Sequence, residues 1–513
     1  MAAIGSAAGV AENRTLVTIS IMLATIMQAL DTTIANVALP HMQGSLSAAQ
    51  DQISWVLTSY IVAAAIMTPM TGWLSARFGR KRVFLGSVLG FTLASMMCGA
   101  ATSLGQMVVF RLLQGVFGAA LVPLSQAVLL DVNPKERHGQ AMAIWGAGIM
   151  VGPILGPTLG GWLTESYNWR WVFYINLPVG ILAFLGILTF VKETGRNKDL
   201  PFDFFGFAML SLGVGALQIM LDRGQQLDWF GSGEIIVECA LAVGALWIFA
   251  VHSFTSAKPF IDLSIFKDRN FLSGNVLIFV VGIVLYATLA LLPPMLQDLF
   301  QYPVITTGEV LMPRGIGTMI AMLFVGRLTG KVDARLMLLL GLSLMSISLW
   351  QMTGYTLEMG DAPILWAGII QGVGIGFTFV PLSTIAFGTL PPERRTEAAA
   401  IFSLLRNVGG SIGISSVVTV LVQNTQTVHQ SLAEHANPYN QQLMSSTVQQ
   451  FWNLGSSGGL AALNAEITRQ ASMVAYVNDF KLMMVVTLAA IPLLLLLRPA
   501  KKGPQPEAHA ALD

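Results

Sequence analysis

The sequence predicts an all-α integral membrane protein with fourteen transmembrane helices, arranged as two six-helix repeats plus a two-helix insert. Three observations lead to this prediction: the composition, the number of long apolar segments, and an internal repeat. Of 513 residues, 54% are hydrophobic and only 11% are charged, and the mean hydropathy is +0.67. Soluble domains carry roughly 25% charged residues, so this much apolar surface predicts burial in lipid.

Each predicted span is an apolar segment long enough to cross about 30 Å of hydrocarbon at about 1.5 Å per residue. Only helices and closed barrels satisfy every backbone group in lipid, and these runs are too continuously apolar for barrel strands. The chain is therefore expected to form a helical bundle. The expected spans are 15–38, 53–74, 83–102, 105–129, 139–163, 171–191, 204–222, 234–254, 271–293, 307–327, 335–355, 363–388, 397–421 and 479–498.

An internal repeat relates the first six spans to the last six. At an offset of 257 residues, Gln114 matches Gln371, Gly152 matches Gly409 and Gly156 matches Gly413. Several matches at one offset are the signature of the repeats found in transporters. The predicted parts are an N-terminal segment (1–14), a first bundle (15–192), a linker with two extra helices (193–269), a second bundle with an outer loop at 422–478 (270–498), and a tail (499–513).

Basic residues are concentrated in the amino-terminal segment and in every second loop. Examples are Arg80, Lys135, Arg327 and Arg394. Because cytoplasmic loops carry the excess of Lys and Arg, both termini are expected to be cytoplasmic and 422–478 is expected to face outward. Metal-ligand spacings, cofactor motifs and basic segments typical of nucleic-acid binding are absent from the sequence, so no metal, cofactor or nucleic-acid partner is expected.

Asp31 is the strongest candidate for a functional side chain. A carboxylate inside a span is costly and usually faces a cavity or a partner. Asp31 lies about seven residues from the outer end of the first span, and Arg111 lies about six residues from the outer end of the fourth. Their depths agree to within a helical turn, which predicts contact. The pair is interpreted either as a proton-coupling site or as a static ion pair that fixes helix packing.

A glycine stripe marks the fifth span. Gly148, Gly152, Gly156 and Gly160 recur at every fourth residue and so share one helix face, where they allow a neighbouring helix to approach closely. Pro153 and Pro157, which are in the same segment, are expected to bend the helix.

Several segments together resemble one family. They are LDTTIANVALP from Leu30, GWLSARFGRKR from Gly72, RLLQGVFGAALVPLSQ from Arg111, GPILGPTLGGWL from Gly152, WRWVFYINLPVG from Trp169 and LQIMLDRGQQLDWF from Leu217. The sequence is similar to the fourteen-helix drug:proton antiporters of the major facilitator superfamily, and most closely to the EmrB-like multidrug exporters. The resemblance implies the major facilitator fold, a location in the cell inner membrane, and proton-coupled export of structurally diverse drug-like compounds by alternating access.

The resemblance also implies roles for particular residues. The glycine stripe, Pro153, Pro157 and Gly161 correspond to the antiporter motif, a packed seam that hinges or seals; ordinary tight packing is the competing interpretation. The residues that correspond to the conserved loop between the second and third spans, a loop that changes conformation during transport, are Gly72, Arg77, Gly79, Arg80 and Lys81. The family usually has an aspartate where this chain has Ala76, and Asp333 in the second copy is a candidate to replace it in part.

The remaining candidates concern the cargo and the partners. The polar and aromatic residues Gln28, Asn36, Gln114, Trp145 and Arg406 are weak candidates for a substrate cavity, as are Met27 and Phe173. The resemblance implies a periplasmic membrane-fusion adaptor and an outer-membrane channel as partners, with segment 422–478 as the docking element or simply as a solvated loop.

The alternative function is proton-driven export of one specific metabolite, lipid or siderophore. An enzyme is disfavoured because no nucleophile motif or histidine cluster accompanies the spans, and an ATP-driven pump because no phosphate-binding glycine loop is present.

Overall fold

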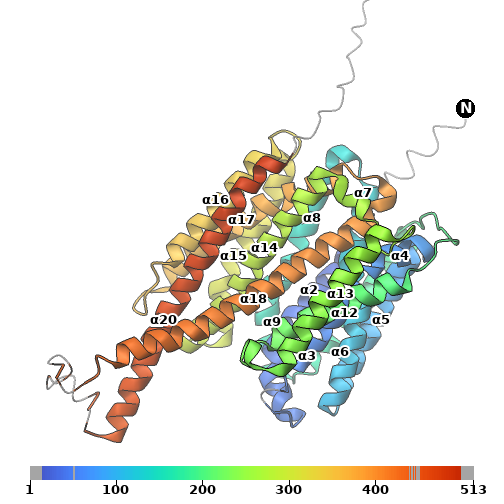
Figure 1. Ribbon diagram of the computed structural model, residues 1–513. Coiled ribbons are helices and arrows are strands. Elements are labelled where there is room, and N and C mark those ends of the chain that lie inside the picture. Colours follow the sequence, from blue (N-terminus) through green and yellow to red (C-terminus); the bar gives the residue numbers. More distant parts are fainter. Residues whose placement is uncertain are drawn as a thin grey trace, which may run out of the picture.

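The structure is a computed structural model that describes residues 14–49, 52–437, 439, 440, 443, 445, 451–453 and 455–497. The expected tail 499–513 and all but the last residue of the expected N-terminal segment 1–14 lie outside the described residues. Within the described chain the regular elements are helices, and the single exception is an isolated bridge between Thr329 and Val332. The prediction of an all-helical bundle is confirmed (Figure 1).

The first half of the chain contains six spans, several of them broken. The elements are α2 (Arg14–Ser45), α3 (Trp55–Met67) with α4 (Met70–Phe78), α5 (Arg80–Ala100), α6 (Leu104–Gly118) with α7 (Leu121–Val132), η1 (Lys135–Arg137) with α8 (His138–Ile149) and α9 (Val151–Ser166), and α10 (Trp171–Tyr174) with α11 (Asn176–Phe190). Pro69, Pro123 and Pro153 each lie at or just beyond a break. Proline leaves the carbonyl four residues earlier without a hydrogen bond, which accounts for these breaks.

The insert and the second half follow. The insert contains α12 (Phe204–Arg223), η2 (Trp229–Gly231), α13 (Gly233–Thr255) and η3 (Leu263–Lys267). The second half contains α14 (Arg269–Pro294) with η4 (Met295–Leu299), α15 (Val304–Leu328), α16 (Ala334–Met352), α17 (Asp361–Gly388), η5 (Pro392–Arg394) with α18 (Arg395–Ala433), and α20 (Ser457–Ala490) with η6 (Ile491–Leu496).

In the described residues, thirteen helices are long and apolar enough to cross a membrane, and the pair α3 and α4, bent by 55°, makes a fourteenth if it counts as one span. Their order matches the fourteen expected segments. Large apolar side chains on their outer faces are strongly exposed, including Trp247 at 71%, Phe254 at 78% and Trp366 at 65%. Such exposure is unfavourable in water and suits contact with lipid.

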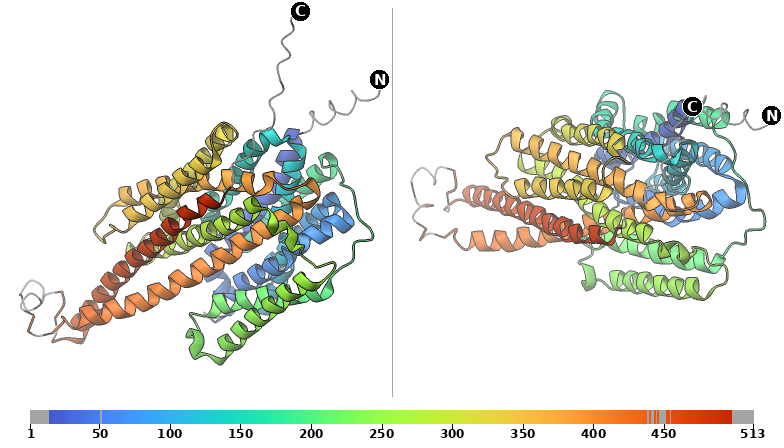
Figure 2. Two further views of the ribbon diagram at one scale, coloured as in Figure 1. Left: turned by 45° about the horizontal axis from the view of Figure 1, so that its top comes forward. Right: turned by 90° about the horizontal axis from the view of Figure 1, so that it is seen from above.

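The segment predicted as the outer loop contains parts of two helices. Segment 422–478 was expected to be an extramembrane loop, whereas α18 continues to Ala433 and α20 already begins at Ser457. The two helices project together beyond the bundle as a hairpin (Figures 1 and 2). Within it, the ring Nε2 of His429 and the side-chain oxygen of Asn464 are 3.0 Å apart. Helices outside the hydrocarbon need no apolar surface, so hydropathy cannot detect these extensions.

The packing of the first half recurs in the second. In the first half α2 packs on α9, α3 on α6, α5 on α6, and α11 on α2 and α5. The corresponding pairs in the second half are α14 with α18, α15 with α17, α16 with α17, and α20 with α14 and α16. The insert helix α12 packs on α13 and touches both halves through α3 and α18, and α13 lies at the outer edge of the bundle (Figure 2).

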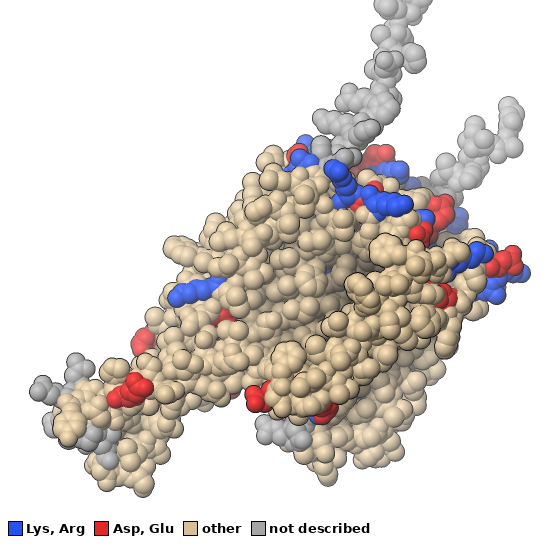
Figure 3. Space-filling view, in the orientation of Figure 1, with Lys and Arg blue, Asp and Glu red and all other residues tan. Residues whose placement is uncertain are grey.

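Basic side chains gather at one end of the bundle, shown at the top of Figure 3. We call this the basic end, defined by the loops at 77–82, 135–137, 327–335 and 394–395. Here the two halves meet, because α4 and α7 contact α18, and α8 contacts α15 and α17. The α9 and α15 pair continues this contact toward the opposite end.

Candidate functional site

Asp31 of α2 and Arg111 of α6 form a buried ion pair. The Asp31 Oδ2 and Arg111 Nη1 atoms are 2.8 Å apart, and each side chain is 1% exposed. Arg111 also donates through Nε to the carbonyl oxygen of Val56, 3.0 Å away. The depths estimated from the sequence therefore correspond to a direct contact in the structure.

Two amides complete the surroundings of the carboxylate. Gln114 and Asn176 each donate to Asp31 Oδ1 over 2.8 Å, and Asn176 also donates to the hydroxyl of Ser95 over 2.9 Å. Gln114 additionally accepts from Arg111 over 2.8 Å. Charged groups in a dry interior persist only when paired and hydrogen-bonded in this way. Asn176 and Ser95 were not among the expected site residues, although a polar amide at the start of the sixth span was a usable signal.

The Arg111 guanidinium lies over two aromatic rings, 4.6 Å from the Tyr60 centroid and 5.6 Å from the Phe173 centroid. Such cation–π contacts help to stabilise a desolvated guanidinium. The arrangement can therefore hold a cation even when its acid partner becomes neutral. Chemically, Asp31 can take a proton and release Arg111, or lose it and recapture Arg111.

The glycine stripe positions the helix that carries Asp31. A Cβ atom on Gly152 would be 2.6 Å from the carbonyl group of Ala29, and one on Gly160 would be 3.2 Å from Ile34. The Thr33 hydroxyl donates to the Gly152 carbonyl oxygen over 3.1 Å, which joins α2 to α9. The stripe thus packs within the first half. The remaining stripe contacts are Gly148 with Met22 and Gly156 with Thr33.

The other side of α9 faces the second half of the chain. Gly161 has Ile305 of α15 as its nearest neighbour, 4.0 Å from a built Cβ atom, and a Cβ atom on Gly308 of α15 would approach Pro157 at 3.7 Å. Helix α9 therefore packs on both α2 and α15, and a Cβ atom on Gly315 of α15 would overlap the Ile154 side chain.

A charge cluster joins the two halves at the basic end. Asp131 at the end of α7 forms ion pairs with Arg80 of α5 and with Arg395 of α18, the latter over 2.8 Å. Arg80 also donates to the carbonyl oxygen of Pro392 over 2.9 Å. Arg80 was expected in this loop. Asp131 was not, because the basic loops contain other acids as well, among them Glu136 in the same loop, and the sequence does not single one out.

The other expected loop residues have different surroundings. Gly79 has a φ of 93°, and a Cβ atom there would meet the Glu193 carboxylate, so glycine is required. Gly72 packs on the backbone of Glu397, because a Cβ atom on Gly72 would be 3.1 Å from the Glu397 Cα atom. Arg77 and Lys81 are half-exposed at the same end. Asp333 is exposed and accepts from the amide of Arg335 in its own helix, so Asp131, rather than Asp333, pairs with Arg80.

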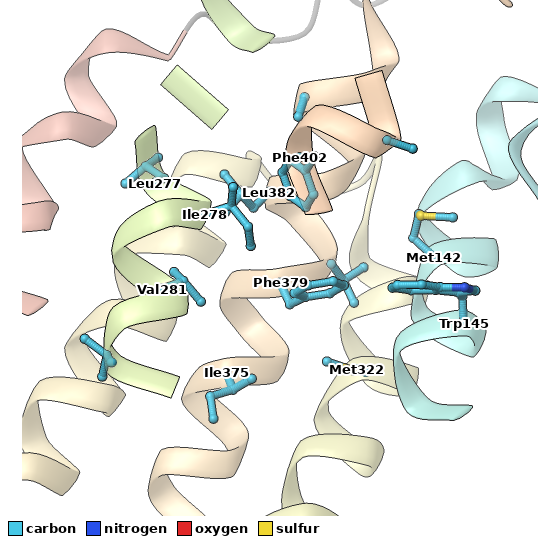
Figure 4. Packing of buried hydrophobic residues seen from close by; sticks show 14 of the residues in the cluster. Met142, Trp145, Leu277, Ile278, Val281, Met322, Ile375, Phe379, Leu382 and Phe402 are labelled. Carbon is cyan, nitrogen blue, oxygen red and sulfur yellow. The ribbon is translucent and has the colours of Figure 1, made fainter. Parts of the chain in front are cut away.

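Several residues predicted to line a substrate cavity are buried in the protein core in this conformation. Trp145 is fully buried, stacks on Phe379 of the second half with ring centroids 5.9 Å apart, and donates to Ser125 (Figure 4). Gln114 belongs to the Asp31 network, and Met27 and Phe173 are 0% exposed. Figure 4 shows Trp145 and Phe379 facing each other across the apolar core between α8 and α17.

Gln28, Asn36 and Arg406 keep some exposure. Gln28 is half-buried and lies 3.4 Å from the Tyr60 hydroxyl, and Asn36 is exposed. Arg406 is half-buried beside Asn407. No group of three or more metal-ligating side chains is found in the part of the chain that the structure describes.

The second half does not repeat the acid of the first. At the 257-residue offset, Thr288 stands for Asp31 and Gly368 for Arg111. Thr288 instead accepts from Nη2 of Arg314 over 2.8 Å, and the Cβ atom of Arg314 is 3.5 Å from a built Cβ atom on Gly368. An arginine from α15 therefore occupies the place that Arg111 takes in the first half.

A bundle of repeated apolar helices with a buried, hydrogen-bonded charge pair is typical of multi-pass membrane transporters, and this is the class of the molecule. The chain belongs to the Major Facilitator Superfamily, whose sequence profile matches residues 21–414.

Curated relatives cover most of the chain. It is 39% identical over 430 residues to the multidrug export protein EmrB of Escherichia coli (strain K12), covering 83% of each protein. It is 36% identical over 487 residues to the fatty acid resistance protein FarB of Neisseria gonorrhoeae, covering 94% of this chain and 96% of that one.

Solved structures share the fold. The human organic anion transporter MFSD10 aligns with a TM-score of 0.60 at 15% identity, covering 92% of this chain and 99% of that one. The proton:xylose symporter XylE aligns with a TM-score of 0.59 at 14% identity, covering 94% and 96%. At these identities the likeness concerns the fold, and it confirms the predicted major facilitator architecture.

Proposed function

We propose that this protein is a proton-coupled antiporter that exports drug-like amphipathic compounds across the cell inner membrane. The observation that carries the proposal is the buried Asp31–Arg111 pair with its two amide donors. The names of the multidrug export relatives support the class of cargo. Export of one lipid-like compound is the second candidate, supported by the fatty acid resistance relative.

The proposed coupling step is an exchange of partners at Asp31. When water reaches the pair, a proton binds the carboxylate and Arg111 is released to its aromatic neighbours Tyr60 and Phe173. Because burial disfavours a lone charge, the neutral acid and the freed guanidinium favour a different packing of α2 and α6. Loss of the proton toward the other side re-forms the ion pair.

The proposed transport cycle alternates access between the two ends. In this conformation the basic end is held by the Asp131 cluster, and Trp145 is stacked on Phe379. Separation of the halves at that end would expose Trp145 and Gln28 toward a central space for cargo. We assign the basic end, and with it both termini, to the cytoplasm; the excess of Lys and Arg at that end supports this assignment.

The proposed partners contact the projecting hairpin of α18 and α20. It extends from the end opposite to the basic end, which is the periplasmic side in this assignment. A periplasmic membrane-fusion adaptor that engages the hairpin would connect the exporter to an outer-membrane channel. The length of the two helices supports this role, since a short connection would suffice to join two neighbouring spans.

The test is transport by purified protein in liposomes under an imposed pH gradient, with lipophilic cations, weak acids and a fatty acid as cargo. Asp31→Asn should abolish gradient-driven transport and leave exchange of labelled for unlabelled cargo active. Glu358→Gln, which changes an exposed acid in a loop, is the matched control and should behave like the natural sequence. Undiminished gradient-driven transport by Asp31→Asn would remove this residue from coupling. Transport of the fatty acid alone would favour the single-cargo alternative.

A further inference from the structure

A second acid, Asp479 of α20, is buried in the second half of the chain. It is 0% exposed, and neither carboxylate oxygen has a hydrogen-bond partner among the described residues. Helix α20 packs here against α14, α16 and α18. Asp31 holds one cation and two amides, whereas Asp479 has no comparable partner, and an ionised carboxylate without partners is very costly in an apolar interior. In this conformation Asp479 is therefore best accounted for as the neutral acid, which carries a proton.

A hollow of about 360 Å³ approaches Asp479 from the end opposite to the basic end. Its lining residues come from η4, α18 and α20, and they are Asp298, Leu299, Leu421, Val422, Thr425, Gln426, Ser472 and Tyr476. On α20, Ser472, Tyr476 and Asp479 are spaced by four and three residues, so they share one helix face. Asp479 lies beyond Tyr476 by about 4.5 Å of helix rise. The same face that lines the hollow therefore continues directly to the buried acid.

Tyr476 lines the hollow together with Asp298 and is about one helical turn from Asp479 on α20. Its side chain is 5% exposed, and both carboxylates are near enough to act electrostatically on its phenol. Asp298 is exposed near the end of the α14 span. A phenol both donates and accepts hydrogen bonds, so Tyr476 can pass a proton between a wetted acid and a buried one.

The other titratable groups near Asp479 are few. Tyr355, which follows α16, packs its ring on Phe480 with centroids 5.9 Å apart, and Lys481 is exposed on the same helix as Asp479. The residues that α18 contributes to the hollow are Leu421, Val422, Thr425 and Gln426, which do not titrate. Tyr286 is the titratable residue of α14 that lies beyond its first turn, and it packs on Gly410 of α18. A lysine or arginine in hydrogen-bond contact with Asp479 is not found in the described chain.

The geometry points to Asp479 as a second proton-binding site, which exchanges protons with the outer side through the hollow and Tyr476. Asp479 and Asp31 lie at similar depth, since each is 17 residues from the basic end of its span (Leu496 and Arg14), or about 26 to 28 Å. Each half of the protein thus has one proton-binding acid: Asp31, which is paired with Arg111, and Asp479, which has no cationic partner. The use of the Asp479 proton to drive transport rests on the proposed function. The binding of a proton by Asp479 does not depend on it.

Infrared spectroscopy tests the binding directly, without transport. The carbonyl stretch of a protonated carboxylic acid should appear at neutral pH in the purified protein, survive in Asp31→Asn and Asp298→Asn, and disappear in Asp479→Asn. Because Asp479 has no partner to lose, Asp479→Asn and Asp479→Leu should both fold as well as the natural sequence. An unchanged band in the two Asp479 variants would overturn the proposal.

The route is tested by exchanging the solvent for deuterium oxide. Tyr476→Phe should keep the band but slow its isotope shift, and unchanged exchange would remove Tyr476 from the route. In liposomes, Asp479→Asn should lower the number of protons moved per cargo molecule while transport itself continues. An unchanged ratio would show that the bound proton is not used. Loss of all transport in the unsubstituted protein would instead count against the proposed function, and the infrared result would stand.

Discussion

Arg395 of α18 donates to the Asp131 carboxylate of α7 over 2.8 Å, so one acid joins the second half of the chain to the first. Arg80 shares the same carboxylate and reaches the Pro392 carbonyl oxygen across the same boundary. Both arginines are less than one tenth exposed, whereas Asp131 is about a quarter exposed. We call these three residues the latch: they join the two halves at the basic end, and Asp131 stays accessible to water.

Asp131→Asn should shift the protein toward conformations open at the basic end. The substitution leaves two buried arginines without an acid, and a partly exposed pair of this kind contributes on the order of 1 kcal/mol. Spin labels at Lys135→Cys and Lys331→Cys, in a background without Cys98 and Cys239, would report the distance between the halves. The distance distribution should broaden toward longer values. Glu136→Gln, an exposed acid in the same loop, should leave it unchanged, and an unchanged distribution in Asp131→Asn would mean that the latch is dispensable.

Arg111→Gln should destabilise the first half strongly. Removing one partner leaves Asp31 buried beside amides alone, and breaking a buried pair costs about 3 to 5 kcal/mol. Thermal unfolding in detergent should therefore move to lower temperature. The double substitution Asp31→Asn with Arg111→Gln should recover much of the loss because no lone charge remains. A double variant no more stable than Arg111→Gln would argue that the destabilisation comes from the Val56 contact instead.

Gly152→Ala and Gly161→Ala form a matched pair on one helix. The first places a Cβ atom 2.6 Å from the Ala29 carbonyl group, so α2 and α9 must separate, whereas the second meets nothing closer than 4.0 Å. Gly152→Ala should lower transport and thermal stability together, and Gly161→Ala should change neither. Equal behaviour of the two variants in both assays would refute a requirement for close packing at the stripe.

Acid should loosen the insert through Asp203, which precedes α12. Burial alone raises the pKa of this carboxyl, but hydrogen bonds from the Gly206 amide, the His252 ring and the Phe260 amide bring its pKa below the ordinary value. The stabilisation is therefore complete above the ordinary carboxyl pKa and is lost as pH falls through the lowered one. Hydrogen exchange in α12 and α13, corrected for intrinsic rates, should rise in that window. Asp203→Asn should show fast exchange at every pH; pH-dependent protection retained in that variant would contradict the assignment.

Shortening the hairpin should separate transport from assembly. Because His429 and Asn464 touch across it, residues 430–463 can be replaced by a short glycine–serine linker without moving the two helices. Transport in liposomes should persist, since the bundle and the hollow beside Tyr476 remain. Pull-down of a co-expressed membrane-fusion adaptor should be lost. Continued capture of the adaptor by the shortened protein would place its docking surface elsewhere.

Much of the fold follows from physical constraints that act locally. The length of the apolar segments predicts the spans. The rise per residue of a helix gives the depths of Asp31 and Arg111 in the membrane closely enough to predict that the two side chains are in contact. The repeat offset predicts that the packing of α2 on α9 returns as that of α14 on α18. These features depend on periodicity and spacing, which a single sequence contains.

Features made by distant residues could not be predicted in the same way. Asn176 joins the Asp31 network because α11 packs on α2, and Asp131 meets Arg395 because α7 packs on α18. Hydropathy predicts a loop at 422–478, because helices outside the hydrocarbon need no apolar surface. Burial of Trp145 depends on Phe379, which is 234 residues away in the sequence. Such contacts are set by tertiary packing.

The two-helix insert has a consequence for how cargo can approach from the lipid. Asp222 accepts from Thr58 of α3, while Gln218 and Trp229 bond Ser411 and Thr419 of α18, each over 2.9 Å. The insert therefore covers the boundary between α3 and α18 and is hydrogen-bonded to both helices. An amphipathic molecule dissolved in the bilayer can enter between the two halves on this side only after those hydrogen bonds break.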